Sequence, residues 1–271
     1  MKKIISTIIS IIASSLLIIL ILFITISQTI LNKKYISAFL NKNNYVNKVY
    51  NSINKELDNY IPQLHIGEED ISLDNIVTKE MITKDINNLI ESIYNNKKLK
   101  TSQSELKKKL DIRINAELNK YNRIPTKEEE KTIEEIKNNI INEYKIRIVF
   151  SEKYIPKINT YYQKTKNILS LTTKIILPLY IFLLGILFLI NKKNEYYKKW
   201  IPISFLTTAI ILIIIKYIIV GKISHILILN ENISEMIKII TKDILTKTTI
   251  IGTLLGIVSI ILLIIGVEEK S

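Results

Sequence analysis

Cysteine is absent from this 271-residue chain, and arginine, histidine, glycine and tryptophan are scarce. Without cysteine the chain forms no disulfide, carries no lipid-modified cysteine and offers no thiolate ligand to a metal. The net charge of +13 comes almost entirely from lysine, because only Arg113, Arg123 and Arg147 are arginines. Nucleic-acid binding favours arginine, whose guanidinium forks match phosphates and bases. We therefore expect no nucleic-acid partner, and we interpret the abundance of Lys, Ile and Asn as the residue usage of an A+T-rich genome.

Charged side chains are missing from four long stretches of the chain. The uncharged runs cover 4–31, 175–191, 200–215 and 248–267. A helix rises about 1.5 Å per residue and needs roughly 20 residues to cross the hydrocarbon core of a bilayer. Lys174 and Lys216 can lie near helix ends and extend their ammonium groups to the lipid headgroups. We therefore predict four transmembrane helices in a lipid bilayer, at 1–31, 174–191, 200–220 and 248–267.

The first apolar run could belong to a signal peptide or to a membrane anchor. It follows a positively charged MKK start, as in a signal peptide, but it is far longer than an apolar signal core of about 7–15 residues. Thr25 and Ser27 form only a marginal cleavage site, since no A-x-A pattern follows the run. We expect an uncleaved N-terminal anchor.

Lysines in the short connections predict the orientation of the chain, because short cytosolic loops are enriched in Lys and Arg. With a cytosolic amino terminus, seven lysines lie on the inner side and four lie in the short outer loop. The inner lysines are Lys2, Lys3, Lys192, Lys193, Lys198, Lys199 and Lys270, and the outer ones are Lys222, Lys238, Lys242 and Lys247. This bias predicts a multi-pass protein of the cell membrane with both termini and the basic loop at 192–199 in the cytosol. Residues 32–173 are then extracytosolic.

Apolar residues in 32–173 recur every three or four positions, which is the period of amphipathic helices. The apolar stripes cover 46–61, 81–94, 106–121 and 133–148. Ser102 with Glu105, and Thr126 with Glu129, have the spacing of a capping box, which satisfies backbone N–H groups of the first helical turn. The predicted fold class is therefore all-α, with four transmembrane helices and an extracytosolic helical bundle inserted between the first and the second.

Residues 174–271 are expected to form a three-helix transmembrane domain with one amphipathic segment outside the membrane. From Lys157 the helical pattern runs into the second crossing, so one helix can continue from the bundle into the bilayer. Residues 232–246 have apolar side chains on one helical face and charges on the other. This segment could lie on the outer leaflet, which we favour, or cover the bundle.

Residues suited to catalysis or metal binding do not occur in a familiar arrangement. His65 precedes Glu68, Glu69 and Asp70, whose carboxylates could hold a divalent cation, but a solvated acidic turn is the simpler interpretation. The sequence has no GxSxG elbow, no phosphate-binding glycine loop and no HExxH pair. We expect no enzymatic activity, no cofactor and no bound metal.

Small residues are spaced for close helix packing on two of the predicted crossings. Gly252 and Gly256 form a GxxxG pattern in the last crossing, and Ser6, Ser10 and Ser14 repeat the four-residue spacing in the first. Small side chains let helix backbones approach closely, which favours helix association in lipid. We hypothesise that these two faces pack together, within one chain or between chains, and chance spacing is the alternative.

The stretch LDNIVTKEMITKDINNLIESIYNNKK, residues 73–98, lies between a first anchor and three later crossings. In this arrangement the chain resembles uncharacterised four-helix membrane proteins of low-G+C Gram-positive bacteria that have a helical extracytosolic domain. The resemblance covers nearly the whole chain and implies the architecture alone. The one-plus-three arrangement also looks like the four-crossing permeases of the FtsX and macrolide-exporter type, which work with a cytosolic ATPase. The chain departs from them in its helical outer domain and in lacking an amphipathic helix between MKK and the first crossing.

A sizeable helical domain outside the membrane, with little chain left for the cytosol, predicts a binding role. The leading hypothesis is an integral membrane protein whose extracytosolic domain binds an envelope component or another membrane protein. The alternative is a permease-like subunit of an ATPase-driven export complex, with the basic loop as the ATPase contact. A structural spacer is a third hypothesis, and self-association is left open.

Overall fold

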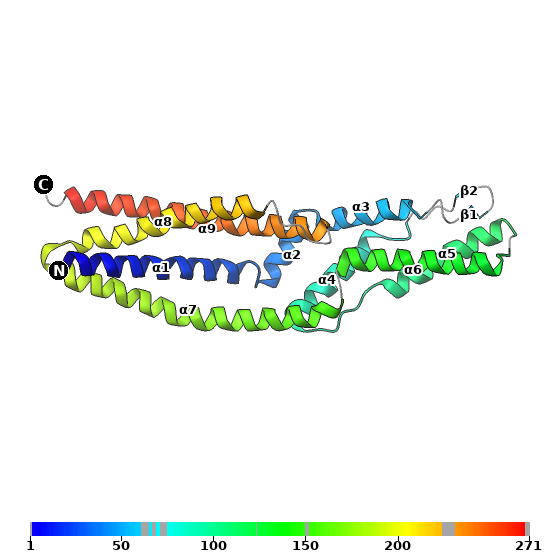
Figure 1. Cartoon of the computed structure of the whole chain (residues 1–271), viewed down its shortest axis with the longest axis horizontal. Helices are drawn as coiled ribbons and strands as arrows, with labels where there is room; N and C mark the ends of the chain where they lie inside the picture. Colours follow the sequence, from blue (N-terminus) through cyan, green and yellow to red (C-terminus); the bar gives the residue numbers. More distant parts are fainter. Residues whose placement is uncertain are drawn as a thin grey trace. The chain divides into compact units, whose positions relative to one another are not determined.

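A computed structural model describes residues 2–60, 65–66, 69–70, 75–122, 124–149, 152–223 and 231–268. These residues are almost entirely helical, which confirms the all-α prediction (Figure 1). The elements in chain order are α1 (Lys2–Gln28), α2 (Lys33–Lys42), α3 (Tyr45–Asp58), β1 (His65–Ile66), β2 (Glu69–Asp70), α4 (Lys79–Asn95), α5 (Gln103–Lys120), α6 (Lys127–Val149), η2 (Glu152–Tyr154), α7 (Ile155–Asn191), η3 (Lys192–Asn194), α8 (Tyr197–Ile223) and α9 (Glu231–Glu268). The two strands form a minimal antiparallel pair.

Four helical segments are long and apolar enough to cross a membrane, and each overlaps one of the four predicted crossings. Helix α7 continues from Ile155 through Asn191 without a break, as the helical pattern from Lys157 predicted. Helix α9 joins the predicted amphipathic segment 232–246 and the last crossing in one helix. No glycine or proline separates those two parts, so nothing in the sequence ends the helix between them.

The chain divides into two compact units, which are described separately. Unit 1 comprises Met1–Asn32, Gln163–Leu227 and Ser234–Ser271, and unit 2 comprises Lys33–Tyr162 and Ile228–Ile233. The division at Tyr162 falls inside α7, whereas the sequence predicted a bundle over 32–173. Helix α7 is continuous across this division, and its residues from Gln163 onward cluster with unit 1.

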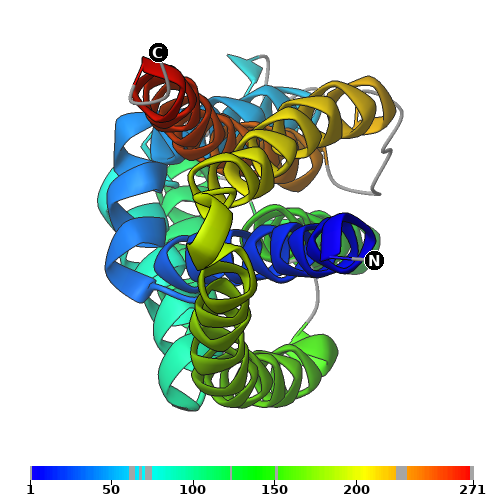
Figure 2. The same cartoon turned by 90° about the vertical axis from the view of Figure 1, so that its left-hand side faces the viewer.

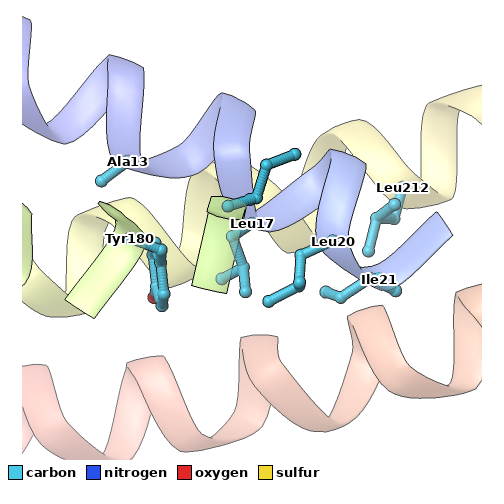
Figure 3. Packing of buried hydrophobic residues seen from close by; sticks show 7 residues of the cluster. Ala13, Leu17, Leu20, Ile21, Tyr180 and Leu212 are labelled. Carbon is cyan, nitrogen blue, oxygen red and sulfur yellow. The ribbon is translucent and has the colours of Figure 1, made fainter. Parts of the chain in front are cut away.

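In unit 1, α1 lies between α7 and α8 (Figures 1 and 2). A buried apolar cluster joins these three helices, with Leu17 and Ile21 from α1, Tyr180 from α7 and Leu212 from α8. Figure 3 shows these side chains gathered between the helix ribbons. Lipid tails are as apolar as such a cluster, so in a membrane these residues would stabilise the unit through close packing rather than through removal from water.

In unit 2, helices α3 to α6 bury the apolar stripes that the sequence predicted. The fully or nearly buried members are Val49, Ile53, Leu57, Met81, Ile82, Ile86, Ile90, Leu106, Leu110, Ile114, Ile136, Ile140, Tyr144 and Ile148. The Thr126–Glu129 capping box is confirmed, because the N–H of Thr126 donates to Glu129 Oε2 at 2.8 Å and the N–H of Glu129 donates to Thr126 Oγ1 at 3.3 Å. Unit 2 therefore has a hydrophobic core of its own.

Candidate functional site

A line of hydroxyl groups runs along the contact between α1 and α8 in unit 1. Ser14 Oγ lies 3.0 Å from the carbonyl oxygen of Ser204 and 3.2 Å from its hydroxyl. Thr208 Oγ1 donates to the carbonyl oxygen of Ser14 at 3.3 Å and to that of Ser204 at 3.0 Å. Ser10 Oγ donates to the carbonyl oxygen of Trp200 at 3.4 Å. Ser10, Ser14, Ser204 and Thr208 are all buried.

At one end of this line, Ser6 of α1 meets Asn191, the last residue of α7. Asn191 Nδ2 donates to Ser6 Oγ at 2.9 Å and to the carbonyl oxygen of Leu187 at 2.8 Å. We call the six buried side chains the polar seam: Ser6, Ser10, Ser14, Asn191, Ser204 and Thr208. The polar seam holds no ionisable group, and each of its side chains has a hydrogen-bond partner. It is therefore suited to holding helices together, which is the usual role of such residues between helices in lipid.

The predicted glycine face of α9 packs closely on α8. A Cβ added to Gly252 would lie 3.2 Å from Leu212 Cβ and 3.5 Å from the carbonyl oxygen of Ala209. A Cβ added to Gly256 would lie 3.4 Å from Ala209 Cβ. The missing side chains at Gly252 and Gly256 therefore allow α8 and α9 to approach each other.

We had hypothesised that the serine face of α1 packs against the glycine face of α9. Within this chain the two faces do not pack against each other. Both instead contact α8, which presents Ser204 and Thr208 to the serines and Ala209 to the glycines. A four-residue spacing of small residues predicts that a helix face permits a close approach, but it carries no information about which helix approaches. Contact between two chains through either face remains a hypothesis.

The predicted basic loop is a tight connection between α7 and α8. Its turn is made by η3 and by Glu195, whose φ is 56°. The ring of Tyr197 packs edge-on against Phe188, with ring centroids 4.8 Å apart. Lys198 Nζ lies 3.5 Å from Glu195 Oε2. Lys192 and Lys193 belong to the turn, whereas Lys198 and Lys199 belong to the first turn of α8, which begins at Tyr197 and not at 200.

A buried carboxylate in unit 2 was missed by the sequence analysis. Asp85 on α4 is 0% exposed. Its Oδ2 accepts the N–H of Ser102 at 2.8 Å and the hydroxyl of Tyr144 at 2.9 Å, and its Oδ1 accepts the Ser102 hydroxyl at 2.8 Å. Burial, and then the charge of Asp85, raise the pKa of the Tyr144 phenol, so this phenol stays protonated and donates. The three bonds join α4, the start of α5 and α6.

The position of Asp85 also explains why the predicted Ser102–Glu105 capping box is wrong. The side chain of Ser102 makes no capping bond, because its hydroxyl and its N–H both donate to Asp85. Glu105 instead lies 3.8 Å from Lys84 Nζ and 3.9 Å from Lys109 Nζ. A signal was present in the sequence: Asp85 falls at helical spacing from Met81, inside an apolar stripe where a charged residue needs a partner.

Two isoleucines on the hairpin formed by α5 and α6 are exposed. Ile124, between the two helices, is 90% exposed, and Ile112 on α5 is 70% exposed. Ile112 lies on the side of α5 opposite to Leu110 and Ile114, which are buried in the core. Ile112 and Ile124 are the most exposed large hydrophobic side chains in the part of unit 2 that the structure describes.

The predicted acidic turn lies partly outside the described residues, since Glu68 is not among them. His65 is opposite Asp70, and Ile66 is opposite Glu69, in the two-stranded pair. Among the residues that the structure describes, no group of three or more His, Cys, Asp or Glu side chains is placed to hold a metal ion.

Comparison with known proteins found no matching family model, no matching curated protein and no matching solved structure. In unit 1 the described side chains hold helices together, through the hydrogen bonds of the polar seam and the close packing of the glycine face. In unit 2 they offer a helical domain held by its apolar core and by Asp85, with Ile112 and Ile124 on its surface.

Proposed function

We propose that this chain is an integral membrane protein that binds an envelope component or another membrane protein through a helical extracytosolic domain. The observation that supports the proposal is the division of the chain into a unit with four apolar helices and a second helical unit with its own core. In this proposal unit 1 crosses the membrane four times. Both termini and the α7–α8 connection lie in the cytosol, because they carry most of the lysines of the short segments.

The α5–α6 hairpin is the surface of unit 2 that we propose for the partner. Ile112 lies on α5 and Ile124 lies in the connection between α5 and α6, and both side chains are in contact with water over most of their surface. Covering an apolar side chain contributes about 25 cal/mol per Å² of area removed from water. A partner with an apolar patch would therefore gain binding free energy from both residues, while the core of unit 2 stays unchanged.

Site-specific photocrosslinking in intact cells tests this proposal. A photoreactive amino acid at Ile112 or at Ile124 is expected to give a discrete adduct with one protein or envelope component. The same amino acid at Asn51, an exposed position on α3, is the control and is expected to give no such adduct. Ile112→Glu and Ile124→Glu should lose the partner without loss of helicity, since both side chains already face water. Identical adducts at all three positions, or none at any, would contradict the proposal.

The permease-like alternative remains a prediction that rests on the basic connection between α7 and α8. In the described structure this connection is a short turn that contains Lys192 and Lys193, and Lys198 and Lys199 follow in the first turn of α8. Co-purification of an ATPase that is lost when Lys192, Lys193, Lys198 and Lys199 are replaced by Gln would favour this alternative over the leading proposal.

A further inference from the structure

An open groove lies between the first turns of α8 and the last turns of α9 in unit 1. It has a volume of about 230 Å³, and Tyr197, Lys198, Pro202, Leu262, Ile265 and Gly266 line it. Among these residues only Tyr197 and Lys198 carry polar side-chain groups, and Lys198 Nζ lies 3.5 Å from Glu195 Oε2. The lining is therefore mostly apolar, with one basic residue, Lys198, at the edge formed by the first turn of α8.

Gly266 forms part of the floor because α8 and α9 approach closely at this point. A Cβ on Gly266 would lie 3.1 Å from Lys198 Cβ and 3.4 Å from the carbonyl oxygen of Lys198. Ile265, beside it, is 50% exposed and forms one wall. If α8 and α9 cross a bilayer, this apolar wall faces acyl chains, and Tyr197 beside it is of a residue type enriched at membrane interfaces.

The α7–α8 connection and the first turn of α8, beside the groove, carry a net positive charge. Lys198 and Lys199 lie in the first turn of α8, and Lys192 and Lys193 lie in the turn before it. Glu195 is the acidic residue of this connection, and its Oε2 lies 3.5 Å from Lys198 Nζ. The four lysines outnumber this carboxylate in the described residues of the α7–α8 connection and the first turn of α8.

We propose that this groove binds one anionic phospholipid. An acyl chain packs on Leu262, Ile265 and Gly266, and the phosphate group is bound by the ammonium of Lys198 and the hydroxyl of Tyr197. A positively charged edge above an apolar floor is complementary to a lipid that carries a negative headgroup on an apolar chain. A zwitterionic lipid fills the floor equally well but gains less from the edge. The inference depends on membrane insertion, and it is independent of the partner proposed for unit 2.

The chain offers its own reporter for this site, because Trp200 is its only tryptophan and lies on α8 between Lys198 and Pro202. The full-length protein is reconstituted into vesicles, and flotation with the vesicles establishes insertion. Trp200 fluorescence is then quenched with phosphatidylglycerol or phosphatidylcholine that carries brominated acyl chains. We expect phosphatidylglycerol to occupy the site about fivefold more readily, which is the effect of about one lysine near an anionic lipid.

Two variants and one matched control separate a site from general attraction. Lys198→Gln is expected to remove most of the preference for phosphatidylglycerol. Lys199→Gln makes the same change of charge one residue away, at a side chain that does not line the groove, and is expected to keep most of the preference. Ile265→Gln alters the wall at an exposed position and is expected to weaken quenching by both lipids, with helicity unchanged.

Several outcomes would overturn the inference. Equal losses in Lys198→Gln and Lys199→Gln would show diffuse surface attraction. Equal quenching by the two lipids in the unaltered protein would show no anionic site. A change of oligomeric state in Ile265→Gln, together with absent lipid preference, would assign the groove to a second copy of the chain. Failure of flotation would instead contradict membrane insertion, on which the proposed function also depends.

Discussion

Ser14 and Ser15 are neighbours with opposite surroundings. Ser14 of α1 is buried against α8, and its hydroxyl is hydrogen-bonded to Ser204. Ser15 is exposed, and its hydroxyl donates to the carbonyl oxygen of Ile11 in its own helix. Ser14→Leu should destabilise the protein by about 1–3 kcal/mol, because it adds volume to a packed contact. Ser15→Leu should leave the thermal unfolding midpoint in detergent nearly unchanged, and similar losses in both variants would contradict the role of the polar seam.

Asp85 is the acceptor for three buried hydrogen bonds in unit 2. Asp85→Ala leaves the donors of Ser102 and Tyr144 unpaired, and each buried unpaired donor costs about 1–3 kcal/mol. We expect hydrogen exchange to accelerate in α4, at the start of α5 and in α6. Asp58→Ala, at an exposed position on α3, is the control and should leave exchange unchanged. Unaltered protection in Asp85→Ala would contradict this assignment.

Glu91 predicts a dependence of stability on acid pH. Hydrogen bonds from Lys33, and then from Asn95 and Lys97, lower the pKa of Glu91 from 4.5 to about 2. A carboxylate with a lowered pKa in the folded state stabilises that state fully above the ordinary value and loses its contribution as pH falls toward the folded value. The unfolding midpoint should therefore fall more steeply between these pH values in the unaltered protein than in Glu91→Gln. Parallel curves would show that Glu91 makes no contribution.

At the scale of helices, the two glycines Gly252 and Gly185 form a natural comparison. Gly252 lies against α8, whereas a Cβ on Gly185 would meet nothing within 4 Å. Gly252→Ile should separate α8 from α9 and lower the thermal stability of the detergent-solubilised protein by about 1–3 kcal/mol. Gly185→Ile adds the same volume at an open position of α7 and should have little effect. Equal stability of the two variants would contradict the close packing of α9 on α8.

The helices themselves could be predicted from the sequence, but their partners could not. The apolar stripes at 81–94 and 133–148 predicted α4 and α6 because burial imposes a helical period on local sequence. The Ser102 cap was wrong because a carboxylate seventeen residues earlier in the chain takes its hydroxyl. The change in charge pattern suggested a division between 232–246 and the last crossing. Helix α9 continues across it, because its backbone hydrogen bonds continue where no glycine or proline interrupts them.

For the whole molecule, the orientation in the membrane is the prediction with the widest consequences. The chain contains no cysteine, so single cysteines at Asn95 in unit 2 and Asn194 in the α7–α8 connection can be labelled selectively; both positions are exposed. In intact cells a membrane-impermeant maleimide should label the cysteine at 95 and not the one at 194. The reverse pattern would place unit 2 in the cytosol and contradict the proposed function, while labelling of both after lysis controls for access.

The sequence by itself determined the all-α class, the four apolar helices and the apolar faces of α3 to α6. These properties follow from local composition and period, since each helix satisfies its own backbone and shows which side it must bury. Only the tertiary structure decided that α8 receives both small-residue faces, that Asp85 takes the donors of Ser102 and Tyr144, and that Lys198 and Gly266 meet at one groove. Such contacts join residues distant in the chain, and many pairings satisfy the same local pattern until the whole chain packs.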